Sequence, residues 1–324
     1  MDKLKLIRRP IETEMDRYVT LFNSVFSHQD DLLGRMLSYV RSRQGKMMRP
    51  MLVVLTAKEF GQVNDNVLRS AVTLELLHTA SLAHDDVVDE SNERRGSASV
   101  NAVFGNKASI LVGDYLLSRA LHEAAKTDKI GIVEVVAKLG GTLSEGELRQ
   151  LSNIQEATAS EESYFDIIRH KTAALFESCG RLGALSVSAP KEMVEVCAKL
   201  GELIGICFQI RDDIFDYFDD PKIGKPTGSD MREGKLTLPS LYAVKTADSD
   251  EVSTWAQQVM ECRADEETIT RFVEYTKDCG GIEYAKGVMQ DYAQQAYRLL
   301  DNFKNAEVRE ALGHYIDFTV ERDR

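Results

Sequence analysis

The residues His84-Asp85-Asp86-Val87-Val88-Asp89 follow an apolar run, from Leu74 to Ala83, that contains neither proline nor glycine. Such a run predicts a buried helix rather than a strand or a loop. Because a helix advances about 100° per residue, Asp85 and Asp89 lie on one face, one turn apart, with Asp86 beside them. Like charges at this spacing repel, and Asp is a mediocre helix former, so the arrangement costs stability unless cations neutralise it. The stretch therefore predicts a metal site, and carboxylate oxygens are ligands that Mg²⁺ prefers.

The same spacing of aspartates occurs again in Asp212-Asp213-Ile214-Phe215-Asp216, also after an apolar helical run. A single cluster of this kind is read equally well as the solvated end of a helix. Two clusters with the same spacing, on separate apolar helices, are much harder to ascribe to chance. We therefore interpret both of them as metal-binding.

Composition limits the class of protein. The chain has 324 residues, of which 43% are hydrophobic, enough for a substantial core. Its formal net charge of −12 argues against nucleic-acid binding and against adsorption to anionic lipid. The basic amino terminus has no apolar core region and no long apolar run follows, so we expect neither a signal peptide nor a membrane span. The cysteines, mostly within apolar helical patterns, indicate reduced core thiols of a cytoplasmic protein: Cys179, Cys197, Cys207, Cys262 and Cys279.

Helical patterns continue along the rest of the chain, where apolar residues recur at intervals of three and four. There is no proline between Pro50 and Pro190, and we find no alternating strand pattern, linker or low-complexity segment. We therefore predict one all-α domain over residues 1–324. The charged residues at its end, Glu321 to Arg324, are expected to be solvated.

Basic and polar side chains recur where an anion could bind. The segment Gly45-Lys46-Met47-Met48-Arg49-Pro50 places a lysine and an arginine at the start of a helix, where backbone N–H groups and the helix dipole favour anions. Lys171 and Thr172 interrupt an apolar helical pattern, and a buried lysine requires a partner anion. His78 lies two helical turns before Asp85, on the same face. Taken singly, these residues are as well explained by an ordinary basic loop, a paired lysine and a core histidine.

Together the motifs resemble those of the trans-prenyltransferases, the all-trans polyprenyl diphosphate synthases. The segment from Asp85 to Asp89, with Arg94 and Arg95, is similar to the first aspartate-rich motif of that family, and Asp212 to Asp216 is similar to the second. The resemblance covers nearly the whole chain and implies a helical bundle of the isoprenoid synthase type around a central cavity, in a homodimer. Five further segments share it, in the same order: Gly45–Pro50, Gly113–Leu117, Gly146–Gln150, Lys171–Thr172 and Gly224–Lys235.

The resemblance also implies a role for each matching residue. Two to three Mg²⁺ ions would bind together with substrate diphosphate, and the catalytic residues would be Lys171 and the six aspartates of the two motifs. The metal ligands would be Asp85, Asp89 and Asp212, supported by Asp86, Asp213 and Asp216. The residues that bind isopentenyl diphosphate would be Lys46, Arg49, His78 and Arg95. Those that bind the allylic diphosphate would be Arg94, Lys171, Thr172, Gln209, Lys225 and Lys235.

The implied reaction is a Mg²⁺-dependent head-to-tail (1'-4) condensation of isopentenyl diphosphate with an allylic diphosphate, farnesyl or geranylgeranyl. Ala80 and Ser81, just before the first motif, are small where short-chain members of the family often place an aromatic residue. An open passage at these positions predicts a long-chain all-trans product of hepta- to decaprenyl size, with octaprenyl favoured, as used in quinone side chains.

Several alternatives stay open. A short-chain synthase would make farnesyl or geranylgeranyl diphosphate in spite of the small residues at positions 80 and 81. A non-catalytic partner subunit of another synthase should have lost one acidic cluster, and a terpene cyclase needs no second diphosphate site. An ordinary helical scaffold predicts that diphosphate with Mg²⁺ would not stabilise the folded state.

Overall fold

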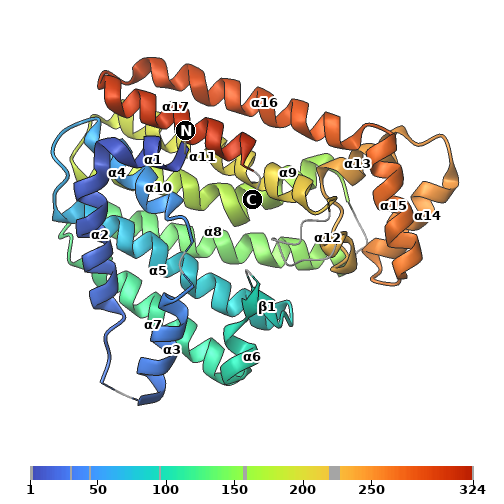
Figure 1. The fold of residues 1–324 in the computed structure, drawn as a ribbon, viewed down its shortest axis with the longest axis horizontal. Helices are drawn as coiled ribbons and strands as arrows, with labels where there is room; N and C mark the ends of the chain where they lie inside the picture. The colour runs from blue at the N-terminus through green and yellow to red at the C-terminus, as the bar shows by residue number, and fades with distance from the viewer. Residues whose placement is uncertain are drawn as a thin grey trace. The chain divides into compact units, whose positions relative to one another are not determined.

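The computed structural model describes residues 3–29, 31–43, 45–94, 96–155, 159–218 and 227–322. These residues are almost entirely helical (Figure 1). The strands that they contain are the two-residue pair β1 (Glu93–Arg94) and β2 (Ser97–Ala98), which form one antiparallel turn after the first aspartate motif. The predicted all-α class is confirmed. In the described part of the chain, no helix is long and apolar enough to cross a membrane.

The chain groups into two compact units. Unit 1 comprises Met1–Gly140, Leu175–Glu202 and Ala296–Phe318, and unit 2 comprises Gly141–Ala174, Leu203–Gln295 and Thr319–Arg324. Some helices contribute residues to both units: α8 (Ile130–Gln155), α11 (Lys191–Phe215), α16 (Gly281–Leu299) and α17 (Ala306–Glu321). The single domain expected from the sequence stays a prediction.

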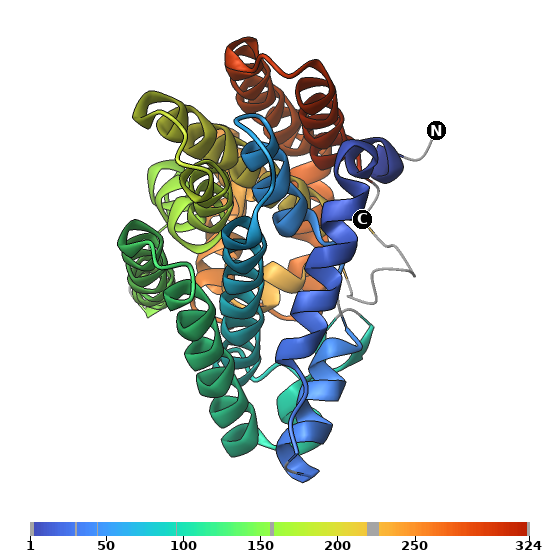
Figure 2. The same cartoon turned by 90° about the vertical axis from the view of Figure 1, so that its left-hand side faces the viewer.

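Unit 1 is built around α5 (Asp65–Val88), the helix that carries the first aspartate motif. The side chain of Asn64 caps its first turn by accepting a hydrogen bond from the backbone N–H of Val67. Apolar residues on several sides of α5 are buried, because α2 (Glu12–Val25), α4 (Met48–Lys58) and α7 (Asn106–Ala125) all pack against it (Figure 2). The other α-helices that precede α8 in this unit are α1 (Lys3–Arg8), α3 (Asp31–Arg41) and α6 (Val100–Phe104).

Close backbone contacts fix the helix α10 (Ala174–Ser186) within unit 1. A Cβ atom added at Gly183 would lie 2.0 Å from the Oγ1 of Thr56 and 2.4 Å from a backbone oxygen of α4. A Cβ atom at Gly180 would lie 2.0 Å from the carbonyl oxygen of Cys197 on α11. Only glycine therefore permits these helices to approach so closely.

We expect Gly183→Ala to lower the free energy of unfolding by about 1–3 kcal/mol, because the added methyl group overpacks a contact with backbone atoms. Gly287→Ala is a matched control, since no atom lies within 4 Å of a Cβ at this helical position. The control should be stabilised by about 0.5–1 kcal/mol through helix propensity. Urea denaturation of both variants measures the difference, and equal stability of the two would contradict the packing argument.

Unit 2 contains α9, a π-helical turn and a group of helices between residues 229 and 278. The turn spans Arg169–Ala173 and continues directly from α9 (Glu161–Ile168). The helices α13 (Leu238–Thr246), α14 (Asp250–Met260) and α15 (Glu266–Asp278) pack against one another (Figure 1). The short helix α12 (Ser229–Arg232) precedes them in the chain.

The cysteines correct one expectation from the sequence. Cys179, Cys197 and Cys207 are buried as predicted, but Cys262 is exposed after α14 and Cys279 is only partly buried at the end of α15. Burial raises the pKa of both Cys197 and Cys207 to about 12, so their reactive thiolate forms are scarce at neutral pH.

We therefore expect one thiol to react quickly with an aromatic disulfide reagent in the native protein, and we expect that thiol to be Cys262. The three buried thiols should react only on denaturation. Mass spectrometry of peptides after a short exposure tests this order. Cys262→Ser should remove the fast phase, and a fast phase that persists in this variant would contradict it.

Candidate active site

The first aspartate motif ends α5 and turns its three carboxylates in different directions. Asp86 is only 2% exposed and accepts a hydrogen bond from the Nε of Arg94 at 2.6 Å. The backbone oxygen of Asp86 accepts from the Nδ2 of Asn101 at 3.1 Å, which ties the helix end to α6. Asp89 is the exposed C-cap residue, and Asp85 is half-buried. Asp86 therefore holds the local structure, and in this structure it binds the arginine that the resemblance assigns to the allylic diphosphate.

The residues around His84 explain a segment that sequence analysis could only match to a family. A Cβ atom at Gly113 on α7 would lie 2.2 Å from the Nε2 of His84. The same nitrogen lies 3.2 Å from the carbonyl oxygen of Ile110 and 3.4 Å from a carboxylate oxygen of Asp114. Gly113 and Asp114 thus accommodate the histidine that precedes the first motif.

His78 lines a cavity of about 70 Å³ in unit 1. Arg43, which sequence analysis did not single out, lines it too, and its guanidinium carbon lies 3.4 Å from the ring centroid of Tyr39. Arg94 and Asp86 contribute to the same cavity, so it adjoins the first motif.

The segment with Lys46 and Arg49 begins α4 as predicted. Met47 has a left-handed backbone (φ 56°) and caps the helix, which begins at Met48 and has Pro50 in its first turn. Lys46 is exposed, with its Nζ 5.0 Å from the ring centroid of Phe318, and the guanidinium carbon of Arg49 lies 5.0 Å from that of Phe176. Arg95, predicted to bind the same substrate, lies outside the described residues.

In unit 2, the three aspartates of the second motif also have different surroundings. The side chain of Asp212 is 42% exposed. Asp213 is buried and accepts hydrogen bonds from the hydroxyl of Tyr164 at 2.5 Å and from the Nε2 of Gln209 at 2.8 Å. The carboxylate of Asp216 accepts from the backbone N–H groups of Ser229 and Asp230 at 3.0 and 3.1 Å.

Burial dominates the electrostatics of Asp213. Desolvation, and after it the negative charge of Asp230, raise the pKa of Asp213 well above the usual value, although the hydrogen bonds from Tyr164 and Gln209 act in the opposite sense. Burial together with the neighbouring Asp213 likewise raises the pKa of Tyr164. Tyr164 is a residue that sequence analysis missed, since nothing in the sequence near it indicates a contact with the second motif.

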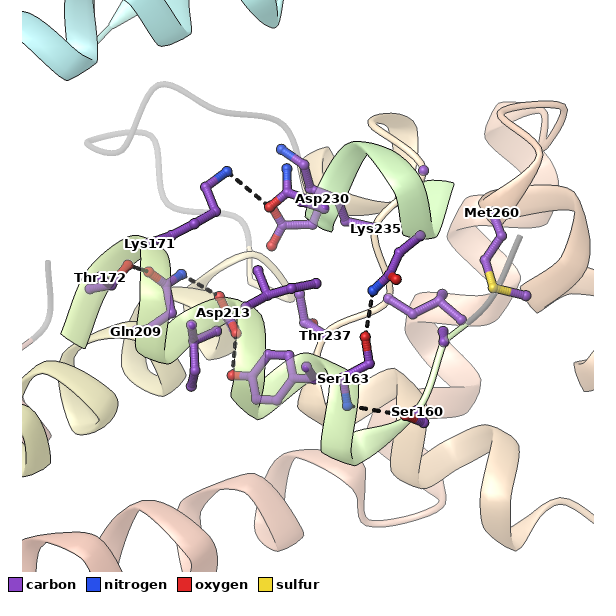
Figure 3. A pocket seen from close by; sticks show the side chains of 18 residues that line it. Ser160, Ser163, Lys171, Thr172, Gln209, Asp213, Asp230, Lys235, Thr237 and Met260 are labelled. Atoms are coloured by element: carbon purple, nitrogen blue, oxygen red, sulfur yellow. Dashed lines mark hydrogen bonds between the residues drawn. The ribbon is translucent and has the colours of Figure 1, made fainter. Parts of the chain in front are cut away.

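Side chains from several elements surround a cavity of about 220 Å³ in unit 2 (Figure 3). Thr172 donates a hydrogen bond from its Oγ1 to the Oε1 of Gln209 at 2.6 Å, and Gln209 in turn contacts Asp213 (Figure 3). The backbone N–H of Lys235 donates to the carbonyl of Asp230 at 2.9 Å, and its Nζ lies 2.5 Å from a carboxylate oxygen of Glu233. The predicted residues that line this cavity are Lys171, Thr172, Gln209, Asp213 and Lys235, whereas Lys225 lies outside the described residues.

The partner anion expected for Lys171 is present within the protein. The Nζ of Lys171 lies 2.5 Å from the Oε2 of Glu147 and 3.0 Å from the Oε1 of Gln150, both on α8. Lys171 and Thr172 belong to the π-helical turn, a wide turn that is frequent at functional sites. A Cβ atom at Gly146 would lie 2.9 Å from the Cγ of Lys171, so this glycine lets the turn approach α8.

The C-terminal residues correct a second expectation. Of the residues expected to be solvated, Glu321 is exposed, and Asp323 and Arg324 lie outside the described residues. The side chain of Arg322, however, is only 9% exposed. Its Nη2 lies 2.5 Å from the Oδ1 of Asp212. The contact joins residues 110 positions apart, so no local sequence pattern could have indicated it.

The donor sets of the two motifs fit a metal that is bound jointly with its substrate. Among the residues that the structure describes, no three His, Cys, Asp or Glu side chains converge closely enough to hold a metal ion alone. Mg²⁺ usually binds through one or two carboxylates together with substrate phosphates and water. Asp85 and Asp89 in unit 1 are carboxylates of this kind, and so is Asp212 in unit 2.

Comparisons with known proteins identify the family. The family described as polyprenyl synthetase matches residues 30–276. An octaprenyl diphosphate synthase of Haemophilus influenzae is 34% identical, with 90% of this chain and 89% of the relative covered. A geranylgeranyl pyrophosphate synthase from Bacteroides thetaiotaomicron is 47% identical, with a TM-score of 0.88 over 99% of this chain and 100% of the other.

A third comparison adds a structure with ligands. A polyprenyl synthase from Caulobacter crescentus, solved with calcium and isoprenyl diphosphate, is 31% identical, with a TM-score of 0.93 over 99% of this chain and 98% of the other. The match of family, relatives and fold agrees with the resemblance that the motifs suggested. The chain therefore belongs to the polyprenyl synthetase family and is a trans-prenyl diphosphate synthase.

Proposed function

We propose that this enzyme condenses isopentenyl diphosphate with farnesyl or geranylgeranyl diphosphate, repeatedly, to make a long-chain all-trans polyprenyl diphosphate of hepta- to decaprenyl size for quinone side chains. The observation that carries the proposal is the cavity in unit 2, where Lys171, Thr172 and Lys235 line the same space as the buried Asp213. A cavity with basic groups beside a carboxylate motif suits a diphosphate held through a divalent cation.

Asp85, Asp89 and Asp212 would hold Mg²⁺, with Asp86, Asp213 and Asp216 as supports. When bound, Mg²⁺ would neutralise the charge that builds on the leaving diphosphate. Each supporting aspartate already accepts hydrogen bonds within the protein. Asp86 accepts from Arg94, and Asp213 accepts from Tyr164 and Gln209. Asp216 accepts from the first two backbone N–H groups of α12. Such contacts orient neighbouring ligands, in the way that outer partners of metal sites generally do.

The basic residues would stabilise the diphosphate as the allylic C–O bond breaks. Lys171 and Lys235 are each held by a glutamate, at 2.5 Å in both cases, and a diphosphate with several negative charges would compete for these ammonium groups. The bond electrons leave with diphosphate, and the allylic cation is attacked by the double bond of isopentenyl diphosphate. Loss of a proton to the released diphosphate completes one extension of five carbons, so no protein nucleophile is needed.

The proposed product length is based on the small residues Ala80 and Ser81, and the known products of the relatives differ in length. The octaprenyl synthase at 34% identity favours a long chain, whereas the geranylgeranyl synthase at 47% identity favours a short one. We retain the long-chain proposal because both residues are small, and we keep a short-chain synthase as the second candidate.

Product analysis tests the proposal directly. The purified protein is incubated with Mg²⁺, farnesyl diphosphate and isopentenyl diphosphate, and the chain lengths are read by chromatography. A ladder that ends at seven to ten isoprene units supports both the reaction and the long product. A stop at geranylgeranyl would keep the reaction and reject the long chain. If neither farnesyl diphosphate nor geranylgeranyl diphosphate, tested as a second primer, were extended, a partner subunit would be favoured.

A homodimer is also part of the proposal, and α7 offers a surface for it. The exposed positions of this helix lie along one side of it, at residues 106, 107, 110, 111, 114, 118, 121, 122 and 125. Ile110, Leu111 and Leu121 on this side are 44%, 67% and 50% exposed, and apolar side chains gathered on one face suit contact with a second subunit. Light scattering should give twice the chain mass, and Leu111→Glu should lower it toward that of one chain.

A further inference from the structure

Arg322 is held firmly beside the second aspartate motif. Its Nη2 is shared between the Oδ1 of Asp212, at 2.5 Å, and the carbonyl oxygen of Phe208, at 3.1 Å. Its guanidinium carbon lies 3.8 Å from the ring centroid of Phe208. These contacts bury a full positive charge against a carboxylate that the proposed function assigns to a metal.

A second arginine fixes the backbone of Arg322. The Nε and Nη2 of Arg211 donate to the carbonyl oxygen of Arg322 at 3.0 and 2.8 Å. Arg211 also packs on Phe215, with its guanidinium carbon 4.7 Å from the ring centroid. Arg322 is thus also held by contacts that do not depend on the charge of Asp212: Arg211 binds its backbone, and the carbonyl oxygen and ring of Phe208 contact its guanidinium.

We propose that Arg322 is the internal counter-ion of Asp212, and that it makes metal binding at the second motif depend on diphosphate. In this role it neutralises Asp212 in the metal-free enzyme and weakens the binding of a divalent cation on its own. The inference rests on the proposed role of Asp212 as a metal ligand.

Two opposite effects of Arg322 on metal affinity have to be weighed. By orienting the carboxylate, an outer partner can strengthen metal binding by about 10- to 100-fold. By its charge, Arg322 repels the cation. A metal ion bound to Asp212 would lie about 2.1 Å from the carboxylate oxygen, and the Nη2 of Arg322 lies 2.5 Å from Oδ1, so the metal ion and the guanidinium would be roughly 5 Å apart. Even at the dielectric of water, this repulsion weakens binding on the order of tenfold, and it is far larger at the lower dielectric of a protein surface. Since Asp212 is less than half exposed, repulsion dominates.

Diphosphate changes this balance. Its several negative charges lie close to any metal that they share with Asp212, and they offset the repulsion between the guanidinium and the cation. The effect of Arg322 should therefore be large for metal alone and small for metal with diphosphate. Metal binding at the second motif would then follow substrate binding.

The test compares metal binding by Arg322→Gln, which keeps hydrogen-bond donors but has no charge, with Arg322→Lys, which keeps the charge. Binding of Mn²⁺, which prefers the same oxygen ligands, is followed by electron paramagnetic resonance in an Asp85→Asn background, so that the second motif dominates. Without diphosphate, we expect Arg322→Gln to bind Mn²⁺ about tenfold more tightly than the Asp85→Asn parent does. The Mn²⁺ affinity of Arg322→Lys should remain close to that of the parent. With inorganic diphosphate, the difference should shrink to less than about threefold. Arg271→Gln, which removes an exposed ion pair in the same unit, is the matched control and should change nothing.

Each other outcome has a definite meaning. Unchanged affinity in Arg322→Gln, or weaker affinity, overturns the proposal, and the weaker result would show that Arg322 orients Asp212. If Arg322→Gln does not fold, Arg211→Gln releases the carbonyl clamp instead and should shift Mn²⁺ affinity in the same direction. Asp212→Asn separates the two proposals: if it binds Mn²⁺ as well as the parent does, the metal role of Asp212 in the proposed function fails.

Discussion

Replacing Asp85 with Asn should lower kcat about a thousandfold while leaving the unfolding temperature nearly unchanged. Asp85 lies half-buried at the end of α5, whereas Asp86 is buried there and accepts a hydrogen bond from Arg94. Asn keeps the size of the side chain but loses the charge that would hold a cation against the leaving diphosphate. Steady-state extension at saturating Mg²⁺, with a thermal melt of the same preparation, measures both quantities.

Two further variants make the comparison specific. Glu90→Gln removes an exposed carboxylate just after the motif and should leave kcat within about twofold of the parent. Asp86→Asn should instead lower stability, by about 2 kcal/mol, because it weakens a charged hydrogen bond of a buried carboxylate to Arg94. If Asp85→Asn retained more than a tenth of kcat, Asp85 would not be a metal ligand.

The parts of the site that were predictable from the sequence are those that depend on local periodicity. The helical period places Asp85 and Asp89 one turn apart, and α5 ends at Val88 as the apolar run indicates. Pro50 and the left-handed Met47 begin α4 where the sequence places a helix start. In these cases, each residue's neighbours in the chain determine its conformation.

The parts that could not be predicted depend on contacts between distant segments. The sequence indicates that Lys171 needs an anion, but it does not show that Glu147 supplies one, since that pairing requires α8 to approach the π-helical turn. In the same way, Tyr164 reaches Asp213 and Arg322 reaches Asp212 only through the tertiary fold. Arg322 looks solvated in the sequence, because the aromatic rings and the arginine that contact it are far away in the chain.

Product length is the property that family membership leaves open, since the relatives include both octaprenyl and geranylgeranyl synthases. Ala80 is fully buried, and the Oγ of the half-buried Ser81 donates to the carbonyl oxygen of His78 at 2.9 Å. Neither residue lines the cavity that contains His78, so the proposed passage for the hydrocarbon would lie on another side of α5. An aromatic ring at these positions would occupy that side.

We therefore expect Ala80→Tyr to shorten the main product from hepta- to decaprenyl size to about three or four isoprene units. The added ring fills the space that the growing chain would enter, whereas the diphosphate-binding residues are unchanged, so the first condensation should proceed. Because Ala80 is fully buried, the variant should also lose about 1–3 kcal/mol of stability through overpacking, and a thermal melt has to show that it remains folded.

Leu82→Phe provides the matched control for that variant, since residue 82 lies on the opposite side of α5 and lines the cavity with His78. It introduces an aromatic ring into the same helix and should leave the product length unchanged. Shortening in both variants would mean that an aromatic ring anywhere in this part of α5 limits growth. Shortening in neither would mean that the hydrocarbon does not pass Ala80, and the long-chain proposal would then lose the residues on which it rests. Only shortening in Ala80→Tyr alone supports a passage on that side of the helix.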